Sequence, residues 1–242
     1  MNETLPSYRD PQKIRQMFDS IARRYDLANH LLSGGIDFYW RRRAAQLVAR
    51  WQPKKVLDLA AGTGDLSLAI AKQLPEAEIT CADFSAEMLE IARSKGLSRT
   101  VVADALQLPF ADETFDCATV AFGLRNMEDW GRAIQEMSRV LIWNGRVVIL
   151  EFSLPTTAPV RSFYRLYLHH FLPALAAIIT GQKDAYAYLG ASIEKFPSGS
   201  DMVQLLEANG FTGATALPLT GGIATIYTAE KAGGAPALQR LS

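Results

Sequence analysis

The sequence predicts an α/β fold: a mostly parallel, seven-stranded sheet with helices on both faces. Apolar runs typical of buried strands alternate with segments of helical periodicity, as in a parallel sheet covered on both sides. A glycine-centred turn also joins the first strand-like run directly to a helical segment, at residues 56–65. We expect a helical N-terminal lobe at 1–52, the sheet domain at 53–231 and a flexible tail at 232–242.

The N-terminal lobe shows helix signals. Asp10 and Pro11 are suited to an N-cap and a first helical position, and a further helix is expected from Asp37 to Trp51, before Pro53. The strands are then expected near residues 55–60, 78–83, 99–103, 115–121, 145–151, 211–217 and 223–229. Helices are expected near 64–73, 86–95, 130–141 and 200–209.

Composition limits the classes of function. The formal net charge of zero gives no overall attraction to nucleic acid, and we predict no nucleic-acid partner. The short basic clusters, among them Arg41-Arg42-Arg43, are expected on solvated helix faces. Cys81 and Cys117 fall inside predicted strands and are expected as buried, reduced thiols of a cytoplasmic protein. No secretion signal opens the chain.

Residues 153–198 form an unusually long connection between a strand and a helix, which is typical of a lid or substrate-binding element. The apolar stretch from Phe163 to Ile179 is interrupted by Arg165, His169, His170 and Pro173, whereas a membrane-spanning helix needs about 20 mostly apolar residues. We therefore expect no crossing of the membrane, but a segment that binds an apolar ligand or rests on a membrane surface.

The glycine turn predicts a nucleotide site. Gly62 and Gly64 allow the backbone to approach a ligand closely, and Thr63 adds a hydroxyl at the mouth of the turn. A dinucleotide fingerprint would need a further glycine where the chain has Ser67, and no second phosphate-binding turn follows.

Acidic residues follow at the ends of the predicted strands. Asp83 could accept both ribose hydroxyls, Asp104 and the backbone of Ala105 could bind an adenine, and Asp58 could meet a ligand's ammonium group. The alternative is that each aspartate only caps the next helix. Several carboxylates and little phosphate-binding machinery favour S-adenosylmethionine, a nucleoside with a cationic sulfonium.

Further motifs make the chain resemble the ubiquinone/menaquinone biosynthesis C-methyltransferase family, from about residue 12 to 231. The motifs are Phe18-Asp19-Ser20-Ile21-Ala22, Tyr25-Asp26 with Asn29, Leu57-Asp58-Leu59-Ala60-Ala61-Gly62-Thr63-Gly64-Asp65, Phe122-Gly123-Leu124-Arg125-Asn126, Glu151-Phe152-Ser153, Tyr188-Leu189 with Ser192-Ile193 and Phe196-Pro197, and Gly221-Gly222-Ile223. Two positions depart from the pattern: Ala60 replaces a glycine common in methyltransferases, and Ala121 replaces a serine of some relatives.

The resemblance implies a Rossmann-like class I S-adenosylmethionine-dependent methyltransferase that methylates a ring carbon of a polyprenylated quinol. The cofactor contacts that we expect are Asp58, Gly62, Thr63, Gly64, Asp83, Phe84, Asp104 and Ala105. No metal is expected for this chemistry.

Methylation of an aromatic carbon requires a neighbouring hydroxyl to lose its proton, and a phenol has a pKa of about 10. Arg125 is the first candidate to stabilise the phenolate, with a structural ion pair to Glu151 or Asp129 as the alternative. Asn126 could orient the quinol oxygen or simply cap a helix.

A direct base is less clear from the sequence. The candidates on segments that could cover the site are Tyr25, Asp26, His30, His169 and His170. A path for the prenyl tail is expected along Phe163, Tyr164, Tyr167, Leu168, Phe171 and Leu172, with a core helix as the alternative reading of that segment.

Other functions share parts of this pattern. A nucleic-acid methyltransferase, a methyltransferase for another small molecule and a non-catalytic nucleotide-binding module would each keep the cofactor half. The sequence does not decide between a menaquinone and a ubiquinone precursor, and it predicts no oligomeric state.

Overall fold

The computed structural model describes residues 30, 33–171 and 183–233. Its sheet has seven strands in the order β3-β2-β1-β4-β5-β7-β6. β7 is antiparallel to both of its neighbours, and the other pairs are parallel. The strands are β1 (Lys55–Leu59), β2 (Glu78–Asp83), β3 (Thr100–Val102), β4 (Phe115–Ala121), β5 (Leu141–Phe152), β6 (Phe211–Leu219) and β7 (Ala224–Lys231).

The described α-helices are α2 (Ile36–Arg50), α3 (Asp65–Gln73), α4 (Ala86–Ser94), α5 (Trp130–Val140), α6 (Ala158–Leu166), α8 (Lys183–Lys195) and α9 (Ser200–Ala208). Five of them, α2, α3, α4, α5 and α9, begin and end close to the ranges that the sequence predicts, whereas α6 and α8 lie in the connection at 153–198, for which no helix bounds are predicted. Short helical turns complete the described elements: η1 (Leu124–Asn126), η2 (Tyr167–Phe171) and η3 (Thr220–Gly222).

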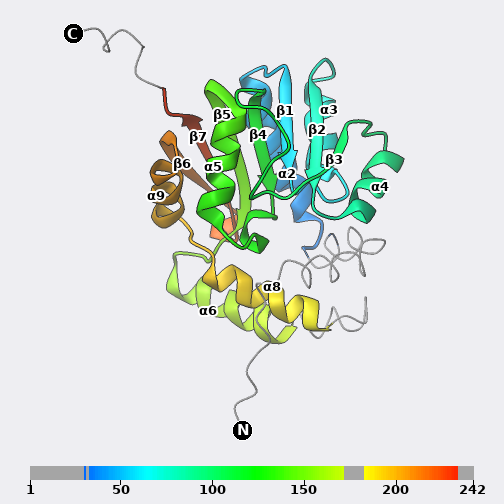
Figure 1. Cartoon of the computed structure of the whole chain (residues 1–242). Helices are drawn as coiled ribbons and strands as arrows, with labels where there is room; N and C mark the ends of the chain where they lie inside the picture. Colours follow the sequence, from blue (N-terminus) through cyan, green and yellow to red (C-terminus); the bar gives the residue numbers. More distant parts are fainter. Residues whose placement is uncertain (1–29, 31–32, 172–182, 234–242) are drawn as a thin grey trace, which may run out of the picture.

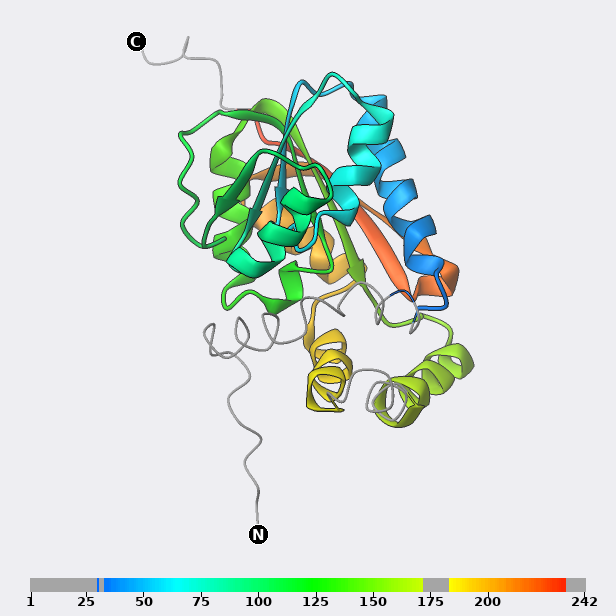
Figure 2. The same cartoon turned by 90° about the vertical axis from the view of Figure 1, so that its right-hand side faces the viewer.

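Helices cover both faces of the sheet, as the sequence predicts (Figures 1 and 2). On one face α2, α3 and α4 bury Trp40, Ile70 and Leu89 in one apolar cluster with the sheet. On the other face α5 and α9 bury their own residues in a second cluster, Met137 and Leu206 among them. Because side chains alternate along a strand, each inner strand contributes to both clusters.

Local capping fixes where two helices near the carboxyl edge begin. The Ser85 hydroxyl accepts a hydrogen bond from the Met88 backbone N–H at 3.1 Å and caps α4. The Asp129 carboxylate accepts one from the Arg132 backbone N–H at 2.9 Å and caps α5. Asp129 is thereby occupied at a helix start, which leaves Glu151 as the partner of Arg125 described below.

The long connection after β5 is folded into helices rather than loop. α6 and α8 lie side by side below the sheet (Figure 2), joined by an ion pair from Arg165 to Glu194 at 3.0 Å. Tyr164, Leu168 and Ile193 are buried in a small apolar cluster between them. The opposite side of the same segment is exposed, with Phe163 at 72% and Phe171 at 57%.

The predicted path for the prenyl tail is therefore split between an inner and an outer face. Tyr164 and Leu168 are inside, Phe163 and Phe171 are outside, and Leu172 lies outside the described residues. Much of the N-terminal lobe and the tail from residue 234 also fall outside the described ranges. Among the described helices, none is long and apolar enough to cross a membrane.

The two cysteines lie where the sequence predicts them, whereas β5 begins earlier than predicted. Cys81 and Cys117 are buried free thiols on β2 and β4, as predicted. β5 begins at Leu141, four residues earlier than the expected start at 145. The reason is a β-bulge: the pairing of β4 with β5 shifts register here, and Asn144 has a φ of +61°.

Candidate active site

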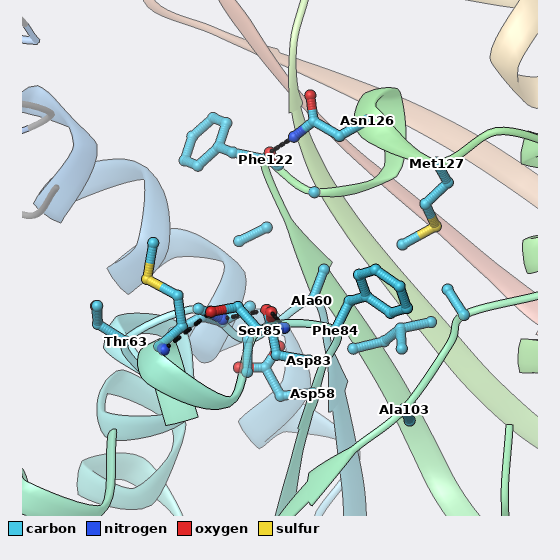
Figure 3. A pocket seen from close by; sticks show the side chains of 18 of the residues that line it. Asp58, Ala60, Thr63, Asp83, Phe84, Ser85, Ala103, Phe122, Asn126 and Met127 are labelled. Atoms are coloured by element: carbon cyan, nitrogen blue, oxygen red, sulfur yellow. Dashed lines mark hydrogen bonds between the residues drawn. The ribbon is translucent and has the colours of Figure 1, made fainter. Parts of the chain in front are cut away.

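A pocket lies over the carboxyl ends of β1, β2, β3 and β4, where open α/β sheets bind ligands. Figure 3 shows acidic and hydroxyl side chains, Asp58, Asp83 and Ser85, on one side of it, with Phe122 and Asn126 on another. The predicted cofactor residues that line it are Asp58, Gly62, Thr63, Asp83, Phe84, Asp104 and Ala105. The geometry thus brings together residues from four separate strand ends.

The glycine turn forms the floor of the pocket. Gly62 has a φ of +57°, and a Cβ placed on it would meet no atom within 4 Å, so its backbone faces open space. Gly64 has a φ of +85°, and a Cβ there would lie 2.2 Å from Cδ1 of Leu97. Gly62 therefore provides close approach to a ligand, whereas Gly64, which is not among the lining residues, is required by packing.

Ala60 adopts the left-handed conformation that usually favours glycine, with a φ of +51°. Its Cβ lies only 2.5 Å from where a Cβ on Gly123 would be. The alanine at position 60 therefore requires a glycine at position 123, on the opposite wall of the pocket. This coupling joins the end of β1 to the turn that follows β4.

Asp83 at the end of β2 holds the rim of the pocket in place. Its Oδ2 accepts a hydrogen bond from the Gly62 backbone N–H at 2.8 Å, and its Oδ1 accepts one from the Ser85 N–H at 2.8 Å. A carboxylate can accept several hydrogen bonds at once, which suits it to ribose hydroxyls. Asp104, after β3, is exposed, and its Oδ1 accepts a local hydrogen bond from the Leu106 backbone N–H at 2.8 Å.

Asp58 is fully buried beneath the glycine turn. The hydroxyls of Ser67 and Thr119 donate hydrogen bonds to it at 2.6 and 2.7 Å. Burial raises the pKa of Asp58 to about 6, against these hydrogen bonds, which lower it. A buried carboxylate with that pKa is stabilised when a cation comes to lie above it, as an ammonium group would.

Arg125 does not line the pocket. Its side chain is 5% exposed, and its Nη1 donates to Oε1 of Glu151 at 2.8 Å and to the Phe122 carbonyl. The sequence predicts Arg125 either beside the methyl position or in an ion pair with Glu151 or Asp129. The structure contains the ion pair with Glu151. The next residue, Asn126, does line the pocket, and its Nδ2 lies 3.5 Å from the Phe122 carbonyl oxygen (Figure 3).

Of the candidate bases, His30 and His169 lie in the described part of the chain, and neither lines the pocket. The His30 Nδ1 lies 2.7 Å from Oδ2 of Asp37, and His169, 43% exposed, pairs with Glu194 at 3.3 Å. Tyr25 and Asp26 lie outside the described residues, as does the side chain of His170.

Arg41 was wrongly expected on a solvated face. Its side chain is only 11% exposed and lines the pocket, and its Nη1 donates to Oδ2 of Asp37. Its guanidinium also lies 5.3 Å from the centre of the Phe122 ring. In the run of three arginines nothing distinguishes Arg41 from its neighbours. The sequence signal that does distinguish it is Asp37, which lies four residues earlier on the same helix face and can form an ion pair with Arg41.

The residues that line the pocket suit S-adenosylmethionine in size and in chemical type. Gly62 leaves room where a side chain would intrude, the carboxylate of Asp83 is of the type that binds ribose hydroxyls, and the buried carboxylate of Asp58 is of the type that attracts an ammonium group. A seven-stranded sheet with an antiparallel β7 and this site at its carboxyl edge define a class I S-adenosylmethionine-dependent methyltransferase.

Comparison with known proteins gives the family. Residues 7–231 match the ubiE/COQ5 methyltransferase family, and the chain belongs to it. It is 46% identical over 220 residues to a demethylmenaquinone methyltransferase of Thermus thermophilus, covering 89% of this chain and 100% of the relative. It is 41% identical over 228 residues to a ubiquinone/menaquinone biosynthesis C-methyltransferase of Geotalea uraniireducens, covering 91% and 97%. The chain is thus an S-adenosylmethionine-dependent C-methyltransferase.

Solved structures agree on the fold. A methyltransferase of Thermotoga maritima described as a possible histamine N-methyltransferase superposes with a TM-score of 0.63 at 17% identity, covering 90% of this chain and 99% of its own. The plantazolicin methyltransferase BpumL superposes with a TM-score of 0.65 at 13% identity, covering 93% and 96%. At such identities the likeness concerns the fold alone.

Proposed function

We propose that this enzyme methylates a ring carbon of a polyprenylated quinol, converting demethylmenaquinol to menaquinol, a ubiquinone precursor to its methylated form, or both. The observation that carries the proposal is identity of 40–46% to demethylmenaquinone methyltransferases over nearly the whole chain. The pocket supports it, because its cofactor half continues into a wall at the end of β4 with aromatic and amide groups, Phe122 and Asn126.

The chemistry requires the acceptor to become a phenolate. When bound, S-adenosylmethionine supplies an electrophilic methyl group on a positively charged sulfur. The residues of this chain must orient the quinol ring, hold its oxygen and exclude water. We assign orientation of the quinol oxygen to the Asn126 amide, which can donate to a phenolate and accept from a phenol.

For Arg125 the contacts support a positioning role. Its ion pair with Glu151 and its bond to the Phe122 carbonyl hold the turn from Phe122 to Asn126 against β5. Its Nε is buried and has no hydrogen-bond partner among the residues that the structure describes. That donor is available to a water or an acceptor oxygen, so stabilisation of the phenolate by Arg125 stays a prediction, as does a role for Tyr25.

The prenyl tail needs an apolar route from the pocket. The Phe122 ring lies 4.5 Å from the Phe152 ring, centre to centre, and Phe152 packs against the cluster formed by Tyr164, Leu168 and Ile193. The outer face of α6 and η2 exposes apolar side chains, Val160, Phe163, Leu166 and Phe171. We propose that this outer face rests on the membrane that holds the quinol, and that the tail passes along the inner cluster.

The test is methyl transfer from labelled S-adenosylmethionine to two reduced lipids, a demethylmenaquinol and a demethylated ubiquinol precursor. Label on either lipid supports the proposal and names the pathway; label on both makes the enzyme dual. Asp83→Ala serves as the donor-site control and should remove transfer to both lipids. Transfer only to RNA or to a small acceptor without a prenyl tail would overturn the quinol assignment.

A further inference from the structure

Arg41 stands apart from the other charged residues of the pocket. The acidic residues that line it are Asp58, Asp65, Asp83, Asp104 and Glu128, whereas Arg41 is the one lysine or arginine among the lining residues that the structure describes. A ligand with a carboxylate would be repelled by such a pocket unless that group meets this cation.

The guanidinium of Arg41 is held in a fixed direction. Asp37 on the preceding turn of α2 is 3% exposed, and its Oδ2 pairs with Arg41 and with Nδ1 of His30. Its Oδ1 accepts from the Ser33 hydroxyl at 2.8 Å. Because Asp37 is itself fixed on both oxygens, the arginine it holds is preorganised rather than a mobile surface chain.

The position of Arg41 in the pocket indicates which end of a bound methyl donor it would contact. The strand order β3-β2-β1-β4 places the proposed adenine and ribose contacts, Asp104 and Asp83, towards one side. Arg41 lies over Phe122 at the end of β4, on the other side, and its charge lowers the pKa of Asp58 under the glycine turn. It is therefore at the end opposite the adenine.

S-adenosylmethionine carries an ammonium and a carboxylate at the end away from its adenine. Asp58 has the charge to meet the ammonium. A guanidinium presents several N–H donors in a plane that matches a carboxylate, and the ion pair with Asp37 uses only Nη1. We propose that Arg41, braced by Asp37, forms the subsite for the carboxylate of the donor's methionyl group, an inference that rests on the proposed use of S-adenosylmethionine.

The experiment compares two ligands that differ in this one part. S-adenosylhomocysteine has the amino-acid end, and 5′-methylthioadenosine has the same nucleoside without it. Calorimetric titration of the full chain would measure both affinities for the wild type, Arg41→Gln, Arg41→Lys and Arg42→Gln. Arg42, the exposed neighbour on α2, is the matched control.

We expect Arg41→Gln to weaken S-adenosylhomocysteine binding by about 10- to 100-fold, as for loss of a hydrogen-bonded charge, and to change methylthioadenosine binding less than about twofold. Arg41→Lys should retain part of the affinity, and Arg42→Gln should match the wild type. Unchanged methylthioadenosine binding also shows that the variant is folded.

Equal losses for both ligands would overturn the proposal, because Arg41 would then shape the pocket as a whole. Unchanged affinity for S-adenosylhomocysteine would overturn it too, and if turnover fell in the same variant the cation would serve the acceptor instead. Neither result depends on which acceptor is methylated, so failure of the quinol assignment would leave the ligand comparison intact.

Discussion

The Arg125 guanidinium and the Glu151 carboxylate form an ion pair in the interior, with Nη1 and Oε1 2.8 Å apart. Their side chains are 5% and 0% exposed. Burial raises the pKa of Glu151, while Arg125 and the backbone N–H groups of Phe152 and Arg125 lower it. The pair links the turn after β4 to the end of β5, directly behind the pocket wall.

Removing one member of this pair should leave a buried charge alone. We expect Arg125→Met to lower the free energy of unfolding by about 3–5 kcal/mol, and Arg125→Met with Glu151→Leu to lower it by less, because no charge then stays unpaired. Urea denaturation of the wild type, both single variants and the double variant measures this coupling. If Arg125→Met were as stable as the wild type but had lost turnover, Arg125 would instead act in the methyl-transfer reaction itself.

Asp58→Asn should have opposite effects on the stability of the protein and on its affinity for the methyl donor. The pKa of Asp58 is raised from 3.8 to about 6, so the folded state binds the proton more tightly, and stability is lost as pH rises from about 4 through about 6. Compared with the wild type, the variant should gain up to about 3 kcal/mol across this range, since it cannot ionise. Urea denaturation between pH 3.5 and 8 gives the difference.

The same variant should bind S-adenosylhomocysteine more weakly. Wild-type affinity should rise as pH increases through about 6, because the ionised carboxylate attracts the ammonium, and Asp58→Asn should lack this dependence. Calorimetric titration at pH 5, 6 and 7.5 tests it. A wild-type affinity that is flat with pH would show that Asp58 does not face the ligand's charge.

Ala60 and Gly123 should be energetically coupled across the pocket. Gly123→Ala alone should cost about 1–3 kcal/mol, since its Cβ would lie 2.5 Å from that of Ala60. Ala60→Gly alone should be nearly neutral, because relief of the positive φ is offset by chain entropy. Adding Ala60→Gly to Gly123→Ala should restore most of the stability in denaturation experiments; additive losses would contradict the coupling.

The outer face of α6 should matter only for lipid contact. Phe163→Ser removes a side chain that is 72% exposed, so the melting temperature should stay within about a degree or two while sedimentation with liposomes falls. Turnover of a quinol with a short, water-soluble tail should be unchanged. Wild-type protein that fails to sediment with liposomes would contradict membrane contact by this face; Thr212→Ser, on the exposed part of β6, is the control.

The sequence predicted the elements well where local signals and burial agree. Strands such as β2 and β4 have the predicted bounds, since an apolar run ends at a polar or small residue in each. The start of β5 differs because Asn144-Gly145 is typical of a turn, and only pairing with β4 turns it into a bulge inside a strand. Sheet pairing is a long-range property that periodicity does not contain.

The site was predicted less completely, for a similar reason. Strand-end residues such as Asp58 and Asp83 reach the pocket because parallel strands end at one edge. Arg41 comes from a helix outside the strand-turn-helix pattern, and only packing on Phe122 brings it there. The sequence allows Arg125 to pair with either Glu151 or Asp129, and no local signal distinguishes these two partners, because the contact with Glu151 depends on how β4 and β5 pack.

The most direct test of the central claim is where the transferred methyl group becomes bonded. Reduced demethylmenaquinol and the ubiquinol precursor would each be incubated with S-adenosylmethionine labelled with carbon-13 in its methyl group, and the lipid products examined by NMR. The account predicts a labelled methyl bonded to a ring carbon. A label on a quinol oxygen, or none in either lipid, would contradict it.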